Sequence, residues 1–115
     1  MSGRLQMANY KVELTKPAKS DLEDVYAYIS TQSLTPAAAL KTVKNIKEEI
    51  KKYLSYMPYY PLVDDPQLAS MGIHRMVVKK YLVFFVIDEE KNTVTVRRII
   101  HGARSWERLL SAKTQ

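Results

Sequence analysis

The stretch HRMVVKKYLVFFVIDEEKNTVTVRRI, residues 74–99, contains three runs rich in apolar and β-branched side chains, separated by short polar segments. Runs of this kind are typical of β-strands. We therefore predict strands at residues 73–79, 81–87 and 93–101, with a turn at residues 88–92. The run at residues 81–87 is apolar on both faces, which indicates a central strand with a neighbour on each side. The short connections predict an antiparallel meander.

Upstream of the meander, the sequence predicts one strand and a first helix. Residues 10–15 alternate apolar and polar side chains, which is the pattern of a strand with one buried face. Pro17 then opens a helix, because a proline in the first helical turn sacrifices no hydrogen bond. The apolar face of this helix comprises Ala18, Leu22, Val25 and Ile29.

Thr35 and Pro36 mark the start of a second helix, as an N-cap followed by proline at the first helical position. This helix extends to about residue 57, where Pro58 ends it. Its predicted apolar stripe, at steps of three and four, comprises Leu40, Val43, Ile46, Ile50, Tyr53 and Met57. The link between the helices is short, so we expect an antiparallel hairpin. Residues 58–72, with three prolines and a glycine, are predicted to be a loop.

The order of these elements predicts an α+β fold. An N-terminal strand precedes a helical hairpin that covers one face of a three-stranded antiparallel meander. A short C-terminal helix is predicted from Ser105 to Leu110, after Gly102 breaks the last strand. The chain of 115 residues has the length of one domain, which we assign to residues 8–115. Residues 1–7 are interpreted as a leader or as residues added by cloning.

The composition favours an anionic partner. The formal net charge is +6 and the pI is near 9.5, although a basic surface also serves solubility. Before Pro58, eight of nine basic residues are lysine, whereas five of the nine from Pro58 onward are arginine. Because arginine presents a planar fork for phosphate or carboxylate, we expect recognition chemistry in the second half. The chain has no cysteine, no visible secretory signal and no run long enough to span a bilayer, so we expect a soluble cytoplasmic protein.

Five stretches together resemble the RelE/ParE superfamily of toxins from bacterial type II toxin–antitoxin systems. They are YKVELTKPAKSDLEDVYAYI, TPAAALKTVKNIKEEIKKY, YPLVDD, HRMVVKKYLVFFVIDEEKNTVTVRRI and HGARSWERLL, and they cover nearly the whole chain from about residue 8. The resemblance implies the microbial-RNase-like toxin fold. It also implies one of two activities, since RelE-like members cleave mRNA in the ribosomal A site and ParE-like members poison DNA gyrase without cleaving anything themselves.

If the activity is RelE-like, the resemblance implies a cationic catalytic site on the strands. Arg75 aligns with a strand lysine of that site, and Arg104 matches a C-terminal arginine region. A second catalytic lysine position falls near Val77, an arginine position falls at Tyr81, and the C-terminal tyrosine position holds a leucine. The known acid and base are therefore missing, which favours the ParE-like activity.

His101 is a candidate replacement for the missing acid or base, because an unperturbed histidine has a pKa of about 6.5. The alternative is that His101 caps or orients the strand end. Arg75 likewise has the alternative of a buried salt bridge. His74, on the opposite face of its strand from Arg75, is interpreted as structural or as a surface residue. Two isolated histidines without clustered carboxylates predict no metal site, and we expect no cofactor.

Further cations near the strand ends are candidates for binding nucleic acid or another target. They are Lys79, Lys80, Arg97, Arg98 and Arg108. Arg98 is placed by alternation on the same face as Val94, Val96 and Ile100, so it either pairs in the core or opens into a groove. Candidates for partner binding are the tyrosines around the hairpin and the C-terminal segment: Tyr26, Tyr28, Tyr53, Trp106, Leu109 and Leu110. The alternative for the last three is that they seal the core.

We therefore expect a toxin that arrests bacterial growth, with a slight preference for a ParE-like gyrase inhibitor. The alternative is a RelE-like, ribosome-dependent and metal-independent endoribonuclease, and a binding module without toxicity is a third hypothesis. In either toxin class, a cognate acidic antitoxin should present carboxylates to the arginines and lay an amphipathic segment along apolar grooves. A homodimer or a larger complex with the antitoxin is compatible with this hypothesis.

Overall fold

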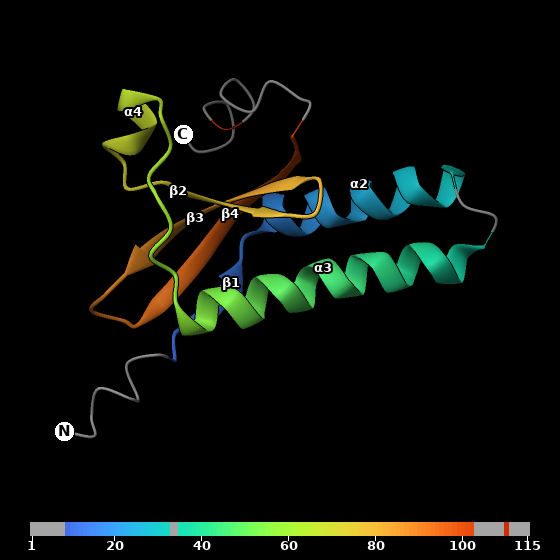
Figure 1. The fold of residues 1–115 in the computed structure, drawn as a ribbon, viewed down its shortest axis with the longest axis horizontal. Helices are drawn as coiled ribbons and strands as arrows, with labels where there is room; N and C mark the ends of the chain where they lie inside the picture. The colour runs from blue at the N-terminus through green and yellow to red at the C-terminus, as the bar shows by residue number, and fades with distance from the viewer. Residues whose placement is uncertain (1–8, 33–34, 103–109, 111–115) are drawn as a thin grey trace.

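The computed structural model describes residues 9–32, 35–102 and 110. Four strands form one sheet in the order β1-β4-β3-β2, and a helical hairpin packs on one face of it (Figure 1). The elements are β1 (Lys11–Leu14), α2 (Lys16–Gln32), α3 (Pro36–Tyr56), α4 (Pro66–Ala69), β2 (His74–Val78), β3 (Tyr81–Asp88) and β4 (Thr93–His101). The predicted α+β fold is confirmed. The predicted C-terminal helix lies outside the described residues, apart from Leu110.

The sheet contains the predicted meander and one pairing that the sequence did not predict. Strands β2, β3 and β4 pair antiparallel, and β3 lies between two neighbours as expected. Strand β1 pairs parallel with β4, from Lys11 opposite Thr93 to Leu14 opposite Val96. A parallel pair needs a long crossover connection, which the α2–α3 hairpin and the rest of the chain supply. Strands β1 and β2 are therefore the two edges of the sheet.

Both faces of the sheet are covered by apolar residues. The larger core lies between the sheet and the hairpin and includes Ile46, Ile50 and Phe85. The smaller core lies on the other face and comprises Val63, Leu68, Ile73, Phe84, Ile100 and Leu110. Full burial of a side chain such as Phe84 or Phe85 contributes about 1.5–3 kcal/mol to stability. The apolar run in β3 thus serves both cores.

The buried stripe of α3 differs from the predicted one. Ile46 and Ile50 are fully buried as predicted, but Leu40, Tyr53 and Met57 are 62%, 45% and 56% exposed. Their places are taken by Ala39 and Leu54, which lie seven residues before Ile46 and four residues after Ile50. The buried positions therefore follow the helical period through Ile46 and Ile50. The prediction was wrong where it chose Leu40 in place of Ala39 and Tyr53 in place of Leu54, because it preferred the larger apolar side chain of two neighbours.

The predicted start of the second helix is confirmed, and a further helix lies in the predicted loop. The Ala38 backbone N–H donates to Thr35 Oγ1 at 3.3 Å, which caps α3. The short helix α4 has the same arrangement, because the Leu68 N–H donates to Asp65 Oδ1 at 3.0 Å. Leu68 is thereby placed in the smaller core. An Asp-Pro pair was the start signal that the loop prediction did not use.

A β-bulge interrupts the pairing of β3 with β4. Phe84 lies opposite Arg98 and Phe85 lies opposite Val96, which leaves Arg97 as the extra residue. After the bulge, Ile99 belongs to the larger core and Ile100 to the smaller one. The prediction that Ile100 shares the face of Val96 was therefore wrong, because strict alternation does not survive an inserted residue.

Candidate functional site

A buried ion pair joins α2 to β4. Arg98 Nε and Nη2 donate to Asp21 Oδ2 and Oδ1 at 2.7 and 2.8 Å, and the Ile99 N–H donates to Oδ2 at 2.8 Å. The hydrogen bond to Asp21 raises the pKa of Arg98, against the opposing effect of burial. Arg98 is only 5% exposed. The alternative that it pairs in the core is confirmed, and its assignment to target binding stays a prediction that this pairing does not support.

Thr15 fixes the start of α2 against the end of β4. Its Oγ1 donates to the carbonyl oxygens of Val96 and Arg97 at 3.1 and 3.0 Å, and accepts from the Ala18 N–H at 3.2 Å. The first turn of α2 is thus fastened to the bulge. Asp21 lies one helical turn after this first turn, so its carboxylate is within hydrogen-bond distance of the Arg98 guanidinium.

The two candidate catalytic residues in the described part of the chain lie on opposite faces of the sheet. Arg75 is paired across the strands with Phe84, which belongs to the smaller core. His101 is paired with Tyr81, which belongs to the larger core, and their rings meet edge to face at 5.4 Å. The sheet therefore separates Arg75 from His101. Arg104, the third candidate, lies outside the described residues.

The histidine that the sequence assigned to a structural role has one. His74 Nδ1 lies 2.6 Å from the carbonyl oxygen of Tyr60, and the ring stacks on Phe85 at 5.4 Å. Arg75, by contrast, forms no ion pair with any residue that the structure describes, and its side chain is half-buried. Within residues 9–32 and 35–102, no carboxylate forms the buried salt bridge that was the alternative for Arg75.

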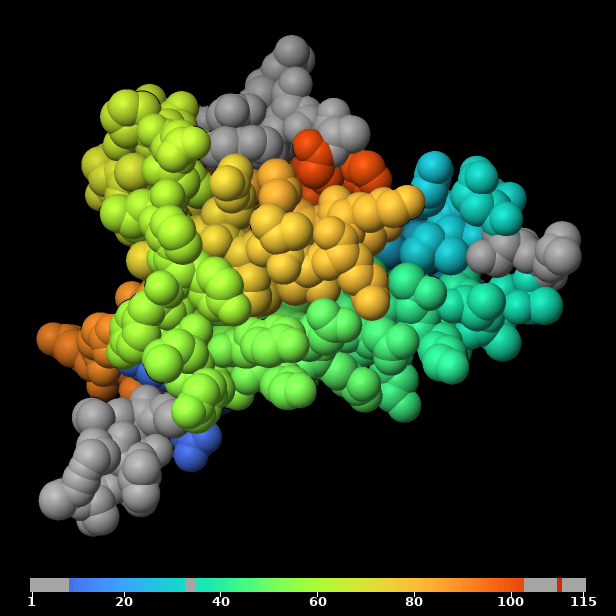
Figure 2. Space-filling view, in the orientation of Figure 1, coloured from blue at the N-terminus to red at the C-terminus, as the bar shows by residue number. Residues whose placement is uncertain are grey.

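The remaining basic candidates are dispersed. Lys79 and Lys80 form the turn between β2 and β3, with Lys79 in the left-handed region at φ +54, and Lys79 Nζ lies 3.5 Å from Glu49 Oε2. This turn lies on the surface beside the helical hairpin (Figure 2). Arg97 is half-buried at the bulge, and Arg108 lies outside the described residues. The described cations therefore do not form one continuous phosphate-binding surface.

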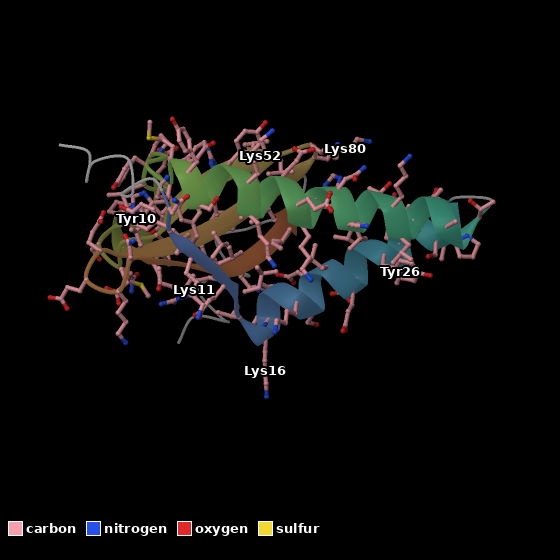
Figure 3. All side chains as sticks on the ribbon, turned by 90° about the horizontal axis from the view of Figure 1, so that it is seen from below. Tyr10, Lys11, Lys16, Tyr26, Lys52 and Lys80 are labelled. Carbon is pink, nitrogen blue, oxygen red and sulfur yellow. The ribbon has the colours of Figure 1, made fainter. Side chains whose placement is uncertain are left out.

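An open groove of about 760 Å³ lies between β1, α2 and α3. Figure 3 shows these three elements from below. We call this groove the β1 groove. Its lining comprises Val12, Glu13, Leu14, Lys19, Leu22, Glu23, Tyr26, Leu40, Val43, Lys47 and Lys51. The groove is bordered by an edge strand and by two helices, and its apolar side chains are accompanied by three lysines and two glutamates. Such a surface suits a partner segment that is apolar on one side and acidic at its margins.

A second cavity, of about 320 Å³, lies on the other side of α2. We call it the aspartate cavity. Its lining comprises Asp21, Asp24, Val25, Tyr28, Tyr81, Ile99 and His101. Burial raises the pKa of Tyr81, and the nearby Tyr28 phenol adds to the effect. No lysine or arginine belongs to this set of described residues, whereas three lysines and two glutamates line the β1 groove.

The predicted partner-binding residues fall in different places. Tyr26 lines the β1 groove, Tyr28 lines the aspartate cavity, and Tyr53 is exposed on α3 outside both. Leu110 is fully buried in the smaller core, so its alternative of sealing the core is confirmed and its assignment to a partner was wrong. Trp106 and Leu109 lie outside the described residues.

Sequence reasoning missed two features of these surfaces. Asp21 was not among the predicted site residues, although a carboxylate on a helix and an arginine on an apolar strand were together a signal for pairing. The β1 groove was missed because the parallel pairing of β1 with β4 was not predicted. Within the described residues, no helix is long and apolar enough to cross a membrane, and no three His, Asp or Glu side chains gather as a metal site would need.

Comparisons with known proteins agree with this architecture. The family model described as the ParE toxin of the type II toxin–antitoxin system parDE matches residues 12–106. The solved chromosomal ParDE system of P. aeruginosa is similar over 80% of this chain and 95% of that one, with 20% identity and a TM-score of 0.64. The RelBE2 toxin–antitoxin complex of Mycobacterium tuberculosis is similar over 85% and 97%, with 27% identity and a TM-score of 0.61. No curated protein sequence matches the chain.

The family match extends from β1 to beyond β4 and so includes the whole sheet, both helices and the bulge. The likeness to the ParDE structure shows the fold, and the likeness to RelBE2 extends over nearly all of that chain. The protein therefore belongs to the ParE family of toxins from type II toxin–antitoxin systems, within the RelE/ParE superfamily.

Proposed function

We propose that this toxin arrests growth by acting on DNA gyrase and that it does not cleave RNA itself. The proposal is carried by the placement of Arg75 and His101 on opposite faces of the sheet. Metal-free RNA cleavage needs a proton acceptor, a proton donor and a cation around one phosphate. Groups that the sheet separates do not meet at one phosphate. The match to the ParE family model supports the same choice.

The helical hairpin is the proposed contact for gyrase. Both helices continue beyond the edge of the sheet (Figure 1), so their far end is accessible to a large target. Outside the β1 groove, α3 carries exposed lysines at Lys41, Lys44 and Lys52. Lys52 Nζ lies 5.5 Å from the centre of the Tyr53 ring, which adds an aromatic surface to the same helix.

A RelE-like endoribonuclease is the second candidate, and one observation favours it. The half-buried guanidinium of Arg75 forms no ion pair within the described residues, so its donors are available to a phosphate. In this alternative Arg75 would act with groups on the same face of the sheet, and His101 would take no part.

We further propose that a cognate antitoxin occupies the β1 groove. Both similar structures carry the names of toxin–antitoxin systems. The groove offers apolar side chains such as Leu40 and Val43 for an amphipathic segment, with Lys19, Lys47 and Lys51 placed to meet its acidic residues. Apolar burial would supply most of the affinity, since charge contributes more to association rate and specificity.

The decisive experiment measures both activities with the same purified protein. We expect inhibition of gyrase supercoiling and accumulation of cleaved gyrase–DNA complexes, with intact mRNA in a reconstituted translation reaction. In cells, induction should arrest growth and switch on the DNA-damage response. Arg75→Ala should leave these effects unchanged. If instead mRNA is cut and Arg75→Ala lowers the rate by about 100-fold or more, the ribonuclease alternative holds.

A further inference from the structure

We propose that the aspartate cavity is a binding site for a guanidinium group. The cavity lies between α2 and the adjoining ends of β3 and β4, away from the β1 groove. Its volume of about 320 Å³ is at the lower end of the range for small-molecule sites, so it suits one side chain or one small ligand. The proposal concerns binding by the folded protein and does not rest on the choice between gyrase and RNA.

The floor of the cavity is rigid and already neutral. Both oxygens of Asp21 accept hydrogen bonds, from Arg98 and from the Ile99 N–H. Asp24, one helical turn further along α2, is exposed and forms no ion pair with any residue described in the structure. A ligand therefore meets one exposed carboxylate, whose charge also acts on Arg98, beside the buried ion pair of Asp21 with Arg98.

The walls are aromatic. Tyr28 contributes a ring from α2, while Tyr81 and His101 contribute rings from paired positions of β3 and β4 that pack edge to face at 5.4 Å. Cations bind over aromatic faces, and the effect is larger where water is excluded. Tyr81 is only 8% exposed, so part of the wall is already withdrawn from solvent.

The charge of the lining selects a cation against a phosphate. The protein as a whole has a net charge of +6, yet the described lining carries a net negative charge through Asp24, because Asp21 is paired with Arg98 and no lysine or arginine belongs to the lining. A guanidinium fits better than an ammonium because it is planar, stacks on rings and can bind a carboxylate through two N–H groups. The source is either an arginine side chain of a protein partner or a free guanidino compound, since both present the same group.

Titration of the whole folded protein with three small probes tests the proposal. The probes are agmatine, Nα-acetyl-arginine amide and the neutral Nα-acetyl-glutamine amide, and binding is followed by heteronuclear NMR. We expect the first two to shift the signals of Tyr81 and His101 saturably and the neutral probe to leave them unchanged. Tighter binding of the arginine amide would identify a protein side chain as the source, and tighter binding of agmatine a free compound.

Matched variants on α2 separate this site from the rest of the helix. Asp24→Asn should weaken binding at least tenfold, because a hydrogen bond to a charged group is lost. Tyr28→Ala should weaken it about two- to fivefold, the loss expected for one exposed cation–π contact. Glu23→Gln removes a neighbouring exposed acid that lines the β1 groove instead, so it should leave the affinity for agmatine and for the arginine amide unchanged.

These substitutions are at exposed positions, so the fold should survive them. Equal binding of the neutral amide would overturn the proposal, and so would an equal loss of affinity in Glu23→Gln and Asp24→Asn. Binding of phosphate in place of the cations, or the absence of any saturable shift with agmatine and the arginine amide, would also overturn it.

Discussion

The two sides of α2 differ in their charged residues but share the same spacing. Lys19, Leu22, Glu23 and Tyr26 line the β1 groove, whereas Asp21, Asp24, Val25 and Tyr28 line the aspartate cavity. Each set follows the positions i, i+3, i+4 and i+7 of a helix, and the second set is displaced by two residues. Ala18, Leu22 and Val25 of the same helix belong to the larger core, so each set includes one core residue, Leu22 or Val25. One helix thus supports a lysine-bordered apolar groove on one side and an acidic aromatic cavity on the other.

This comparison shows that a basic protein need not bind anions everywhere. The net charge of +6 describes the average surface, and the groove follows it through Lys19, Lys47 and Lys51. The aspartate cavity differs from this average, because its described lining contains no arginine or lysine. Arg98 lies next to the lining but is paired with Asp21. Local pairing therefore decides which charges a partner meets.

The largest expected effect comes from breaking the floor of the cavity. Asp21→Ala would leave the Arg98 guanidinium and the Ile99 N–H buried without this acceptor, so we expect a loss of about 3–5 kcal/mol in the free energy of unfolding. Urea denaturation followed by circular dichroism measures it. Glu23→Ala, on the groove side, should stay within about 0.5 kcal/mol of the parent.

A double variant separates the stability contributed by the ion pair from the cost of burying the Arg98 charge. Combining Asp21→Ala with Arg98→Met also removes the buried charge that has lost its Asp21 acceptor, so stability should recover in part relative to Asp21→Ala alone. If the single variant costs less than about 1 kcal/mol, the pair does not hold α2 against β4 as we infer.

The same ion pair shows what a sequence could and could not predict. Strands, helices and their order followed from periodicity, because Ile46, Ile50 and the apolar run of β3 repeat at the periods of their elements. Arg98 was correctly placed on a largely apolar strand, but its partner lies 77 residues away and alternation gave no indication of it. The bulge at Arg97 also shifted Ile100 to the other face, which periodicity alone does not reveal.

The two cavities were beyond sequence reasoning for a related reason. Each depends on elements that are distant in sequence, since the groove needs β1 beside β4 and the cavity needs α2 beside the end of β4. The tyrosines were identified as candidates from their type alone, so Tyr26 and Tyr28 were grouped although the helix directs them to different sides. Residue type predicted the chemistry, and the tertiary fold decided where it is used.

The next largest effect is expected on antitoxin affinity in the β1 groove. Leu40 is 62% exposed and lines the groove, so Leu40→Asp should weaken binding of the cognate antitoxin by about 30- to 100-fold, as for a central apolar contact. Met57→Asp is the matched control, because Met57 is 56% exposed near the end of α3 but outside the groove lining. Calorimetry of both variants measures the difference, and similar losses in the two would place the antitoxin elsewhere.

A smaller effect is expected from the lysines that border the groove. Lys47→Glu combined with Lys51→Glu should slow antitoxin association by about tenfold while dissociation changes little, since exposed charges act mainly on encounter. For the unaltered pair, raising the salt concentration should lower affinity only modestly, because apolar burial is screened little. A steep collapse of affinity at moderate salt would show an electrostatic clamp instead and contradict the groove model.

The smallest expected effect is on the stability of the protein at alkaline pH, and it tests whether water is excluded from the aspartate cavity. Burial, assisted by Tyr28, raises the pKa of Tyr81 above its ordinary value of about 10. The neutral phenol is therefore favoured in the folded protein. The resulting contribution to stability is complete below about pH 10 and falls as the pH rises above it, because the unfolded chain ionises first. Tyr81→Phe should remove this part of the alkaline decline in stability.

Direct titration of Tyr81 by NMR completes this test. Tyr28→Phe should lower the pKa of Tyr81 only slightly, since burial is the larger cause and the phenol of Tyr28 the smaller one. A Tyr81 phenol that ionises in the ordinary range would show that water fills the space beside it. The aromatic wall would then contribute little to binding a cation, because water in the cavity weakens the attraction of the rings. The contrast between the two sides of α2 would then rest on charge alone.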